Sequence, residues 1–195
     1  MKNGHDFASM IWLNEPQSWE TANDKLTMAV TPRSDYWRIS HYGFTKDDGP
    51  FLYAPVGGEF ETKLKITGDY TARYDQAGLM IRIDHEHWLK AGIEYVDGKY
   101  NISIVVTHHT SDWSVITLDH PSESIWIKAV RCRDAVELFY SFDDKEYIMM
   151  RICWMQEDCP GMVGPYAACP EGDGFDARFE HFCIKPIPKK DKEQK

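Results

Sequence analysis

Residues 74–98 read YDQAGLMIRIDHEHWLKAGIEYVDG and hold two apolar runs on either side of a polar centre. In the first run, every second residue from Ala77 onward is apolar, which is typical of a strand whose alternate side chains face a core. The second run repeats this alternation from Ala91 onward. The polar DHEH at residues 84–87 lies between the runs, and an Asp-Gly turn signal follows them. This stretch therefore predicts an antiparallel hairpin that continues into a third strand.

The rest of the chain repeats short strand-like runs separated by turn residues. Apolar and charged residues alternate in EFETKLKI at 59–66. The runs NISIVVT at 101–107 and AVELFYSF at 135–142 are rich in the β-branched and aromatic residues that strands prefer. Helical periodicity does not recur. We expect roughly eleven to thirteen strands in an all-β fold, an antiparallel β-sandwich or barrel.

The composition of the 195-residue chain fits one soluble domain. Hydrophobic residues make up 43%, enough for a sizeable core, and a net charge of -9 disfavours nucleic acid and anionic membranes as partners. No apolar stretch reaches the length of a membrane span. Five cysteines without a close pair are expected to be reduced. We expect a cytoplasmic protein without metal or cofactor, with one β-sandwich domain over residues 1–185 and a flexible basic tail over 186–195.

The DHEH run places four potential metal ligands or proton-transfer groups in consecutive positions. On a strand, His85 and His87 would share one face, and a His-x-His pair can bind zinc when another element supplies a third ligand. The candidates for that third ligand are His41, His108, His109 and Asp112. The competing interpretation is a solvated hairpin turn, because the flanking residues are strand-like on both sides. We favour the turn and assign no metal ligand.

A second polar set lies on the two strands beside that turn. Alternation on both strands places four polar residues on the face opposite the apolar one, namely Gln76, Arg82, Lys90 and Glu94. Glycines between them are expected to keep this surface open. The aromatic or imidazole groups that we place near its rim are Trp37, His41, Tyr42 and Trp113. Carboxylates and amides bond hydroxyls and rings pack on C–H faces, so this set predicts a site for a sugar-like molecule. The alternative is an ordinary solvated sheet face.

Patterns for catalysis are weak. Glycoside hydrolysis needs two carboxylates that flank the bond, and the alternating E-x-D-x-x-E strand of related sandwich hydrolases does not occur. Asp75 and Glu94 are one conceivable pair, but nothing in the sequence brings them together. A G-x-S-x-G nucleophile motif and a phosphate-binding glycine loop are also missing. We therefore assign no catalytic residue.

Four segments together resemble a known family. They are FASMIWLNEPQSWE at 7–20, DYWRISHYGFTKDDGPFLY at 35–53, the stretch at 74–98, and VGPYAACPEGDGFDARFEHF at 163–182. The resemblance is to the domain-of-unknown-function family that includes the fungal "regulation of enolase" proteins, and it covers most of the chain. It implies a concanavalin A-like, jelly-roll β-sandwich in a cytoplasmic setting. It also implies enolase or another metabolic enzyme as the partner to test.

Three functional hypotheses follow from these observations. The first, which rests on the resemblance, is a non-enzymatic cytosolic binding or regulatory protein that acts on enolase or on carbohydrate metabolism. The second, which rests on the polar sheet face, is a lectin-like module for a glycan or small polyol. The third is a glycoside hydrolase-like enzyme, for which the carboxylate pair is the missing element.

Overall fold

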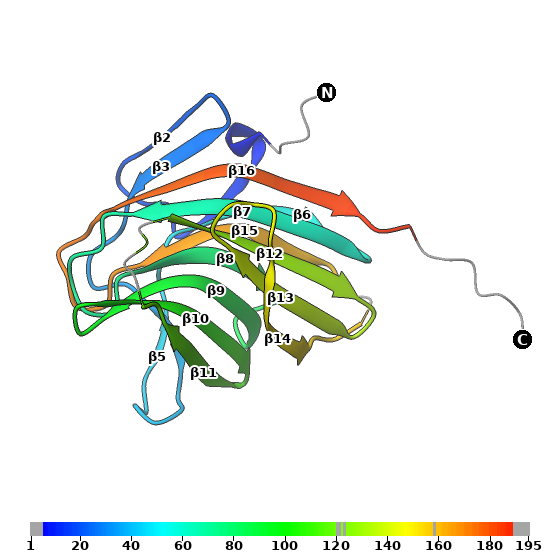
Figure 1. Cartoon of the computed structure of the whole chain (residues 1–195). Helices are drawn as coiled ribbons and strands as arrows, with labels where there is room; N and C mark the ends of the chain where they lie inside the picture. The colour runs from blue at the N-terminus through cyan, green and yellow to red at the C-terminus, as the bar shows by residue number, and fades with distance from the viewer. Residues whose placement is uncertain (1–5, 120–121, 123, 158, 189–195) are drawn as a thin grey trace, which may run out of the picture.

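The chain, seen in a computed structural model, folds as a sandwich of two seven-stranded antiparallel sheets with a small hairpin against one of them (Figure 1). The described residues are 6–119, 122, 124–157 and 159–188. Sheet A has the order β1 (Ile11–Leu13), β6 (Phe51–Val56), β15 (Gly161–Ala168), β8 (Gln76–Arg82), β9 (His87–Val96), β10 (Lys99–His108), β11 (Thr110–Thr117). Sheet B has the order β14 (Ile148–Trp154), β13 (Ala135–Ser141), β12 (Ser124–Cys132), β7 (Phe60–Gly68), β16 (Asp176–Pro186), β3 (Lys25–Ala29), β2 (Trp19–Ala22). The hairpin consists of β4 (Tyr36–Arg38) and β5 (Thr45–Asp47), and a 3-10 turn, η1 (Phe7–Ser9), precedes β1.

This arrangement confirms the predicted antiparallel β-sandwich. The described residues form sixteen strands, more than the roughly eleven to thirteen expected from alternation. The excess arises because pairing also recruits three-residue segments such as β1, β4 and β5, which are too short to show a period. Among the described residues, no helix has the length and apolar character needed to cross a bilayer.

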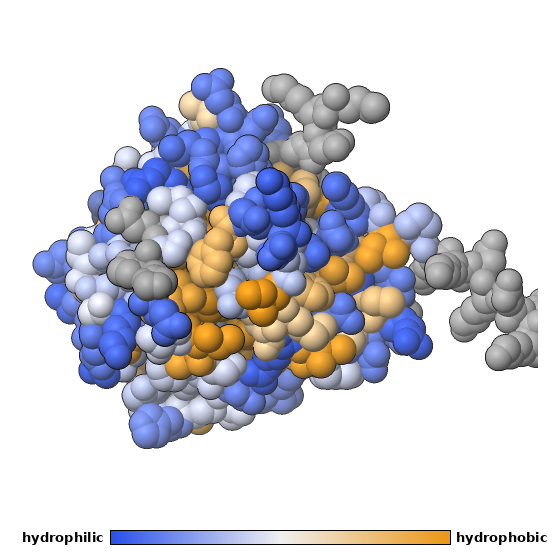
Figure 2. Space-filling view, viewed as in Figure 1, coloured by the Kyte–Doolittle hydropathy of each residue, from blue (hydrophilic) through white to orange (hydrophobic). Residues whose placement is uncertain are grey.

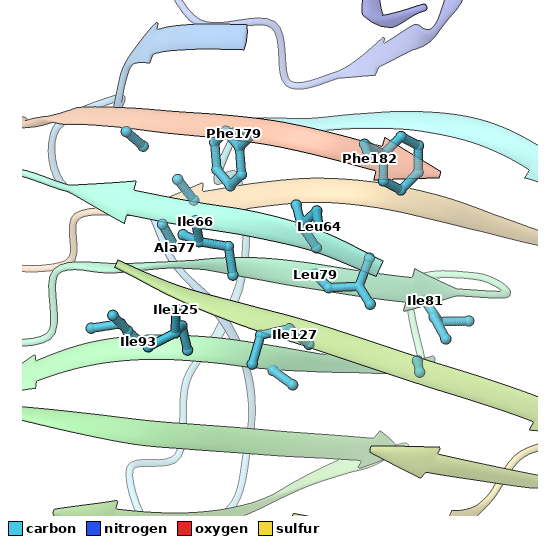
Figure 3. Packing of buried hydrophobic residues seen from close by; sticks show 14 of the residues in the cluster. Leu64, Ile66, Ala77, Leu79, Ile81, Ile93, Ile125, Ile127, Phe179 and Phe182 are labelled. Atoms are coloured by element: carbon cyan, nitrogen blue, oxygen red, sulfur yellow. The ribbon is translucent and has the colours of Figure 1, made fainter. Parts of the chain in front are cut away.

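The structure confirms the hairpin predicted at residues 74–98, both in the pairing of its two strands and in the face that each strand turns toward the core. Strand β8 pairs with β9 so that Gln76 lies opposite Glu94. The apolar side chains of these strands point at sheet B, where Leu79 and Ile93 pack among residues of β7, β12 and β16 (Figure 3). The connecting turn covers residues 83–86, and His87 already belongs to β9. The turn assignment for DHEH is therefore confirmed except at its last residue.

The opposite face of sheet A is buried as well. All seven residues of β8 are buried, although four of them lie on the face that points away from sheet B. A second apolar cluster covers this outer face, made of Tyr36, Trp37, Phe51, Met80, Trp88, Val105 and Tyr166. Two of these residues come from β4, so the β4–β5 hairpin forms part of the cover. The alternative of an ordinary solvated sheet face is wrong for β8 and β9.

The two central glycines, Gly78 of β8 and Gly92 of β9, do not leave an open surface, because neighbouring atoms pack directly against them. Gly78 lies opposite Gly92 on one side and opposite Tyr166 on the other. A Cβ atom at Gly78 would lie 2.7 Å from the Tyr166 ring and would also clash with the Ala91 carbonyl. The expectation that these glycines keep the face open is therefore wrong, because the Tyr166 ring from β15 occupies the space.

The last described residues remain attached to sheet B. Strand β16 ends at Pro186, and the Ile187 N–H donates to the Glu59 carbonyl at 2.9 Å. The start of the segment expected to be flexible is thus paired. Residues 189–195 lie outside the described residues, so flexibility of the basic tail stays a prediction.

Gly78→Ala should destabilise the fold, because the new methyl group would overlap Tyr166 and the Ala91 carbonyl. Overpacking of this kind typically costs about 1–3 kcal/mol. Gly57→Ala is the matched control, since no atom lies within 4 Å of its Cβ position and its φ is not in the left-handed region. Urea unfolding followed by tryptophan fluorescence measures both variants. Equal free energies of unfolding for the two would contradict this packing.

Candidate ligand-binding site

A cavity of about 370 Å³ opens on the outer face of sheet A, beneath the β4–β5 hairpin. Its walls come from segments that lie far apart in the sequence: the hairpin, the turn before β8, strands β8 to β11, and the turn after β15. The lining residues are Asp35, Trp37, Tyr42, Phe44, Arg73, Tyr74, Gln76, Lys90, Glu94, Val105, Trp113, Pro170 and Glu171. The cavity therefore combines a polar floor with an aromatic rim.

The structure brings six of the eight residues proposed from the sequence into this one cavity. They are Trp37, Tyr42, Gln76, Lys90, Glu94 and Trp113. The other two, Arg82 and His41, do not line it. His41 is exposed and packs edge-on against Tyr42 with ring centroids 4.7 Å apart. Binding of a ligand by the six residues stays a prediction, which the geometry below supports.

Lys90 is the centre of the cavity floor and is only 3% exposed. Its Nζ donates to Gln76 Oε1 at 2.5 Å and to the Tyr36 carbonyl at 2.8 Å, and it lies 3.6 Å from Asp35 Oδ1. Burial lowers the pKa of Lys90, while the charges of Asp35 and Glu94 oppose that shift. The amine thus fastens β9 to β8 and to the hairpin at one point.

Glu94 is the second buried charge of the floor. Its Oε2 accepts a hydrogen bond from Trp113 Nε1 at 2.9 Å, and the same indole N–H lies 3.0 Å from Ser103 Oγ. Burial raises the pKa of Glu94, and the Lys90 charge opposes this effect. Trp113 therefore uses its only polar atom to orient Glu94, which leaves its ring as an apolar wall.

Five aromatic side chains form the walls and mouth of the cavity, namely Trp37, Tyr42, Phe44, Tyr74 and Trp113. The ring of Tyr42 packs against Trp37 at 5.5 Å and against Phe44 at 5.8 Å between centroids, and it remains 46% exposed. Burial and a hydrogen bond with Tyr42 raise the pKa of Tyr74 to about 12. These rings offer flat apolar surfaces beside a hydrogen-bonding floor.

The turn that carries Tyr42 holds a strained backbone. Ile39 has φ 63°, a left-handed conformation that β-branched residues rarely adopt, and His41 has φ 62°. The Ile39 N–H donates to the Phe44 carbonyl, and the Gly43 N–H donates to the Ile39 carbonyl, both at 2.7 Å. Strained residues of this kind are concentrated at binding sites, and here the strain lies in the turn that positions the rim.

Arg82 anchors the hairpin instead of lining the cavity. Its guanidinium donates to both carboxylate oxygens of Asp47 on β5, at 2.5 and 2.7 Å, and its side chain is only 5% exposed. Arg82 shares a sheet face with Gln76, but six residues of strand separate the two by about 20 Å. The sequence correctly predicted the face of Arg82 but could not show its distance from the cavity.

The DHEH turn anchors the other end of the hairpin. Glu86 accepts from Arg38 of β4 and from His109 Nδ1, at 2.5 and 2.8 Å. Asp84 Oδ1 accepts the backbone N–H groups of Glu86 and His87, which closes the turn. Within the described residues, no group of three or more His, Cys, Asp or Glu side chains is arranged to hold a metal ion.

Asp75 and Glu94, the carboxylate pair considered from the sequence, do not meet. Asp75 lies next to Gln76 and points away from the cavity, where it accepts the N–H groups of Thr71 and Ala72 at 2.9 and 2.8 Å. The second carboxylate near Glu94 is Asp35, which sequence analysis missed. Other missed lining residues are Phe44, Arg73, Tyr74, Val105, Pro170 and Glu171. Most of them lie in connecting segments, which have no periodicity that could reveal them.

Comparison with known proteins places the chain among proteins of unknown function. Residues 12–187 match the family described as "Protein of unknown function (DUF1349)". The chain is 35% identical over 173 residues to "Regulation of enolase protein 1" of Saccharomyces cerevisiae, which spans 89% of this chain and 87% of that protein. A crystal structure of a functionally unknown protein from Saccharomyces cerevisiae has a TM-score of 0.90 and 34% identity, over 94% of this chain and all of that one.

More distant structures share the fold alone. A GH43 protein from Bacillus licheniformis superposes with a TM-score of 0.69 at 17% identity, over 95% of this chain and 39% of that one. Together with the two packed antiparallel sheets, this likeness confirms the concanavalin A-like jelly-roll sandwich implied by the resemblance. The resemblance to the "regulation of enolase" family is confirmed by the matches above.

Arg82→Ala should lower the free energy of unfolding by roughly 3 kcal/mol, because the truncation leaves the Asp47 carboxylate without its partner and frees one end of the hairpin. Arg33→Ala removes a comparable pair, Arg33–Asp173, whose side chains are 64% and 97% exposed. That control should change stability by less than about 1 kcal/mol. Chemical denaturation of both variants gives the comparison. An Arg82 variant as stable as the Arg33 variant would rule out the anchoring role.

Proposed function

The chain belongs to the DUF1349 family of proteins of unknown function, and we propose that it is a binding protein whose cavity takes a small, neutral, polyhydroxylated ligand. The observation that carries this proposal is the buried Gln76–Lys90–Glu94 floor beneath an aromatic rim. Hydroxyl groups both donate and accept hydrogen bonds, which suits a floor that contains amide and carboxylate groups. The C–H faces of a sugar or cyclic polyol pack well on the rings of Tyr42 and Trp113.

The charges of the lining residues favour a neutral ligand over an anionic one. Both lining cations are already paired: Lys90 with Asp35 and Gln76, and Arg73 with Asp97 at 3.2 Å. The lining set also contains the carboxylates of Glu94 and Glu171. A phosphate or carboxylate on the ligand would therefore meet negative potential without an uncommitted cation to bind it.

The arrangement supports recognition rather than turnover. Glu94 is held by Trp113, and Asp35 accepts the Tyr36 N–H at 2.7 Å in addition to facing Lys90. Both carboxylates are thus committed to protein groups, whereas acid and base catalysis needs carboxyl groups that can exchange protons with substrate. A glycoside hydrolase-like activity is the alternative, and hydrolysis of a panel of aryl glycosides by the purified chain would establish it.

Neutral polyols should raise the melting temperature of the protein in a thermal-shift screen, and their charged analogues should not. Each test compound is paired with its phosphate or uronic acid counterpart, so that only charge differs. For a compound that binds, titration calorimetry should show at least about tenfold weaker affinity for the charged member, a difference of about 1.4 kcal/mol. Equal or tighter binding of the anionic member would contradict the neutral-ligand proposal.

Tyr42→Ala should weaken binding of the same polyol about tenfold, because one contacting ring is lost from the rim. Tyr42 is 46% exposed, so its truncation spares the core, and Phe142→Ala, at a 54% exposed ring outside the cavity, is the matched control. Calorimetric titration of both variants measures the change. If both variants bind as the parent chain does, the ligand occupies another site.

We also propose, from the name of the yeast relative, that this binding protein has a regulatory role directed at enolase in the cytoplasm. The expected result is a complex between the purified chain and purified enolase, detected by sedimentation velocity, together with a changed enolase rate. The measurement is made with and without the polyol that binds the cavity. If neither a complex nor a change in the enolase rate is seen with this protein in excess over enolase, the enolase proposal is wrong. The ligand-binding proposal would be unaffected.

A further inference from the structure

A broad apolar surface lies on one flank of the sandwich, over the region where Figure 1 draws β11, β13 and β14 (Figure 2). Six large apolar side chains, each 46–59% exposed, come from β11, from β14 and from the turn before β14. They are Ile116, Phe142, Ile148, Met149, Ile152 and Trp154, and are called the flank patch below. The flank patch thus holds half of the twelve exposed large hydrophobic residues among the described ones.

The flank patch coincides with one free edge of each sheet. Strand β11 is the last strand of sheet A, and β14 is the last strand of sheet B. Side chains join the two edges: Arg151 of β14 donates to Ser114 Oγ at 3.0 Å and to Asp112 Oδ2 at 3.3 Å. The flank therefore joins one edge of each sheet and presents the outer backbone groups of β14, of which the Trp154 carbonyl accepts a hydrogen bond from His108 Nε2 at 3.0 Å.

Strand β14 lacks the side chains that usually protect an edge. Its sequence, IMMRICW, contains no lysine and no proline, and its single charge, Arg151, is turned toward β11. The register shift in its pairing with β13 falls beside Met149 and leaves both Ile148 and Met149 more than half exposed. An edge of this composition is stable in solution when another strand or surface covers it.

We propose that two copies of this chain associate through the flank patch, with their β14 edges side by side. Aromatic side chains such as Phe and Trp bury roughly 150–250 Å² each and Ile and Met are smaller, so six half-exposed side chains offer no more than about 600 Å². Stable interfaces bury about 800 Å² per partner, and the adjoining strand edges supply the remainder. A two-fold axis brings the same patch of each copy together, which is the commonest symmetry of soluble oligomers.

The charge distribution is consistent with such a contact. The Arg151–Asp112 pair is neutral as a whole, and Glu137, the cross-strand neighbour of Ile152, adds one negative charge beside the flank patch. The net charge of -9 on each chain repels at a distance, and salt screens that repulsion. Dimer formation should therefore strengthen as salt rises, whereas contact through opposite charges would weaken.

Sedimentation velocity over a hundredfold range of concentration, at low and moderate salt, tests the proposal. The parent chain should sediment as a dimer at the highest concentrations. Ile152→Lys and Trp154→Lys should each raise the dissociation constant of the dimer at least tenfold, so that the monomer predominates. Ile11→Lys is the matched control, because Ile11 is 50% exposed on β1, the opposite edge of sheet A. Melting curves of all variants check folding, and backbone amides of β14 should gain protection from hydrogen exchange with concentration.

Each other outcome overturns the proposal. A chain that stays monomeric throughout the range excludes the contact between two copies. A dimer that persists in both lysine variants of β14 forms through another surface. Equal loss of the dimer in the Ile11 control shows general repulsion by added charge rather than a specific contact.

Discussion

The side chain of Lys90 bears a positive charge, although only 3% of the residue is exposed to solvent. A buried ammonium group is stable only where fixed acceptors replace water. Gln76 of β8 supplies one acceptor, the Tyr36 carbonyl of β4 supplies another, and Asp35 supplies the opposite charge. The hairpin cannot leave sheet A without stranding this charge. The cover of the sheet and the cavity beneath it therefore depend on the same amine.

Two ion pairs extend this constraint to both ends of the hairpin. Arg82 holds Asp47 on β5, and Glu86 holds Arg38 on β4. The outer face of the β8–β9 hairpin thus divides into residues that form the cavity floor and residues that fasten its cover. The strained turn at Ile39 lies between the two pairs and presents Tyr42 to the cavity mouth. Fixing both ends of a short hairpin makes this strained conformation sustainable.

The sequence predicted what depends on local periodicity and missed what depends on distant segments. Alternation over residues 74–98 was enough for the hairpin, its core face and the proximity of Gln76 to Glu94. The alternation of residues 74–98 does not show that a second layer covers the other face of the sheet. That layer comes from residues 35–48, which are held by ring packing and ion pairs. Arg82 and Gly78 were misjudged for this reason. Both residues lie on the predicted face of the sheet, but their partners lie in strands remote in the sequence: Asp47 for Arg82 and Tyr166 for Gly78.

Clusters in sequence and clusters in space follow different rules in a β-sheet protein. The four adjacent groups of DHEH do not meet at one point, since neighbouring positions in a turn and strand point in different directions. They separate into two pairs: His87 Nδ1 lies 2.9 Å from Asp84 Oδ1, and His85 Nε2 lies 3.8 Å from Glu86 Oε1. Their partners are correspondingly different: Asp84 closes the turn, and Glu86 binds Arg38 and His109. Convergence instead needs residues two apart on a strand or directly opposite on its neighbour. Gln76 and Glu94 follow that rule as cross-strand partners, whereas Lys90 lies opposite Met80 on the same face and reaches Gln76 with its long side chain.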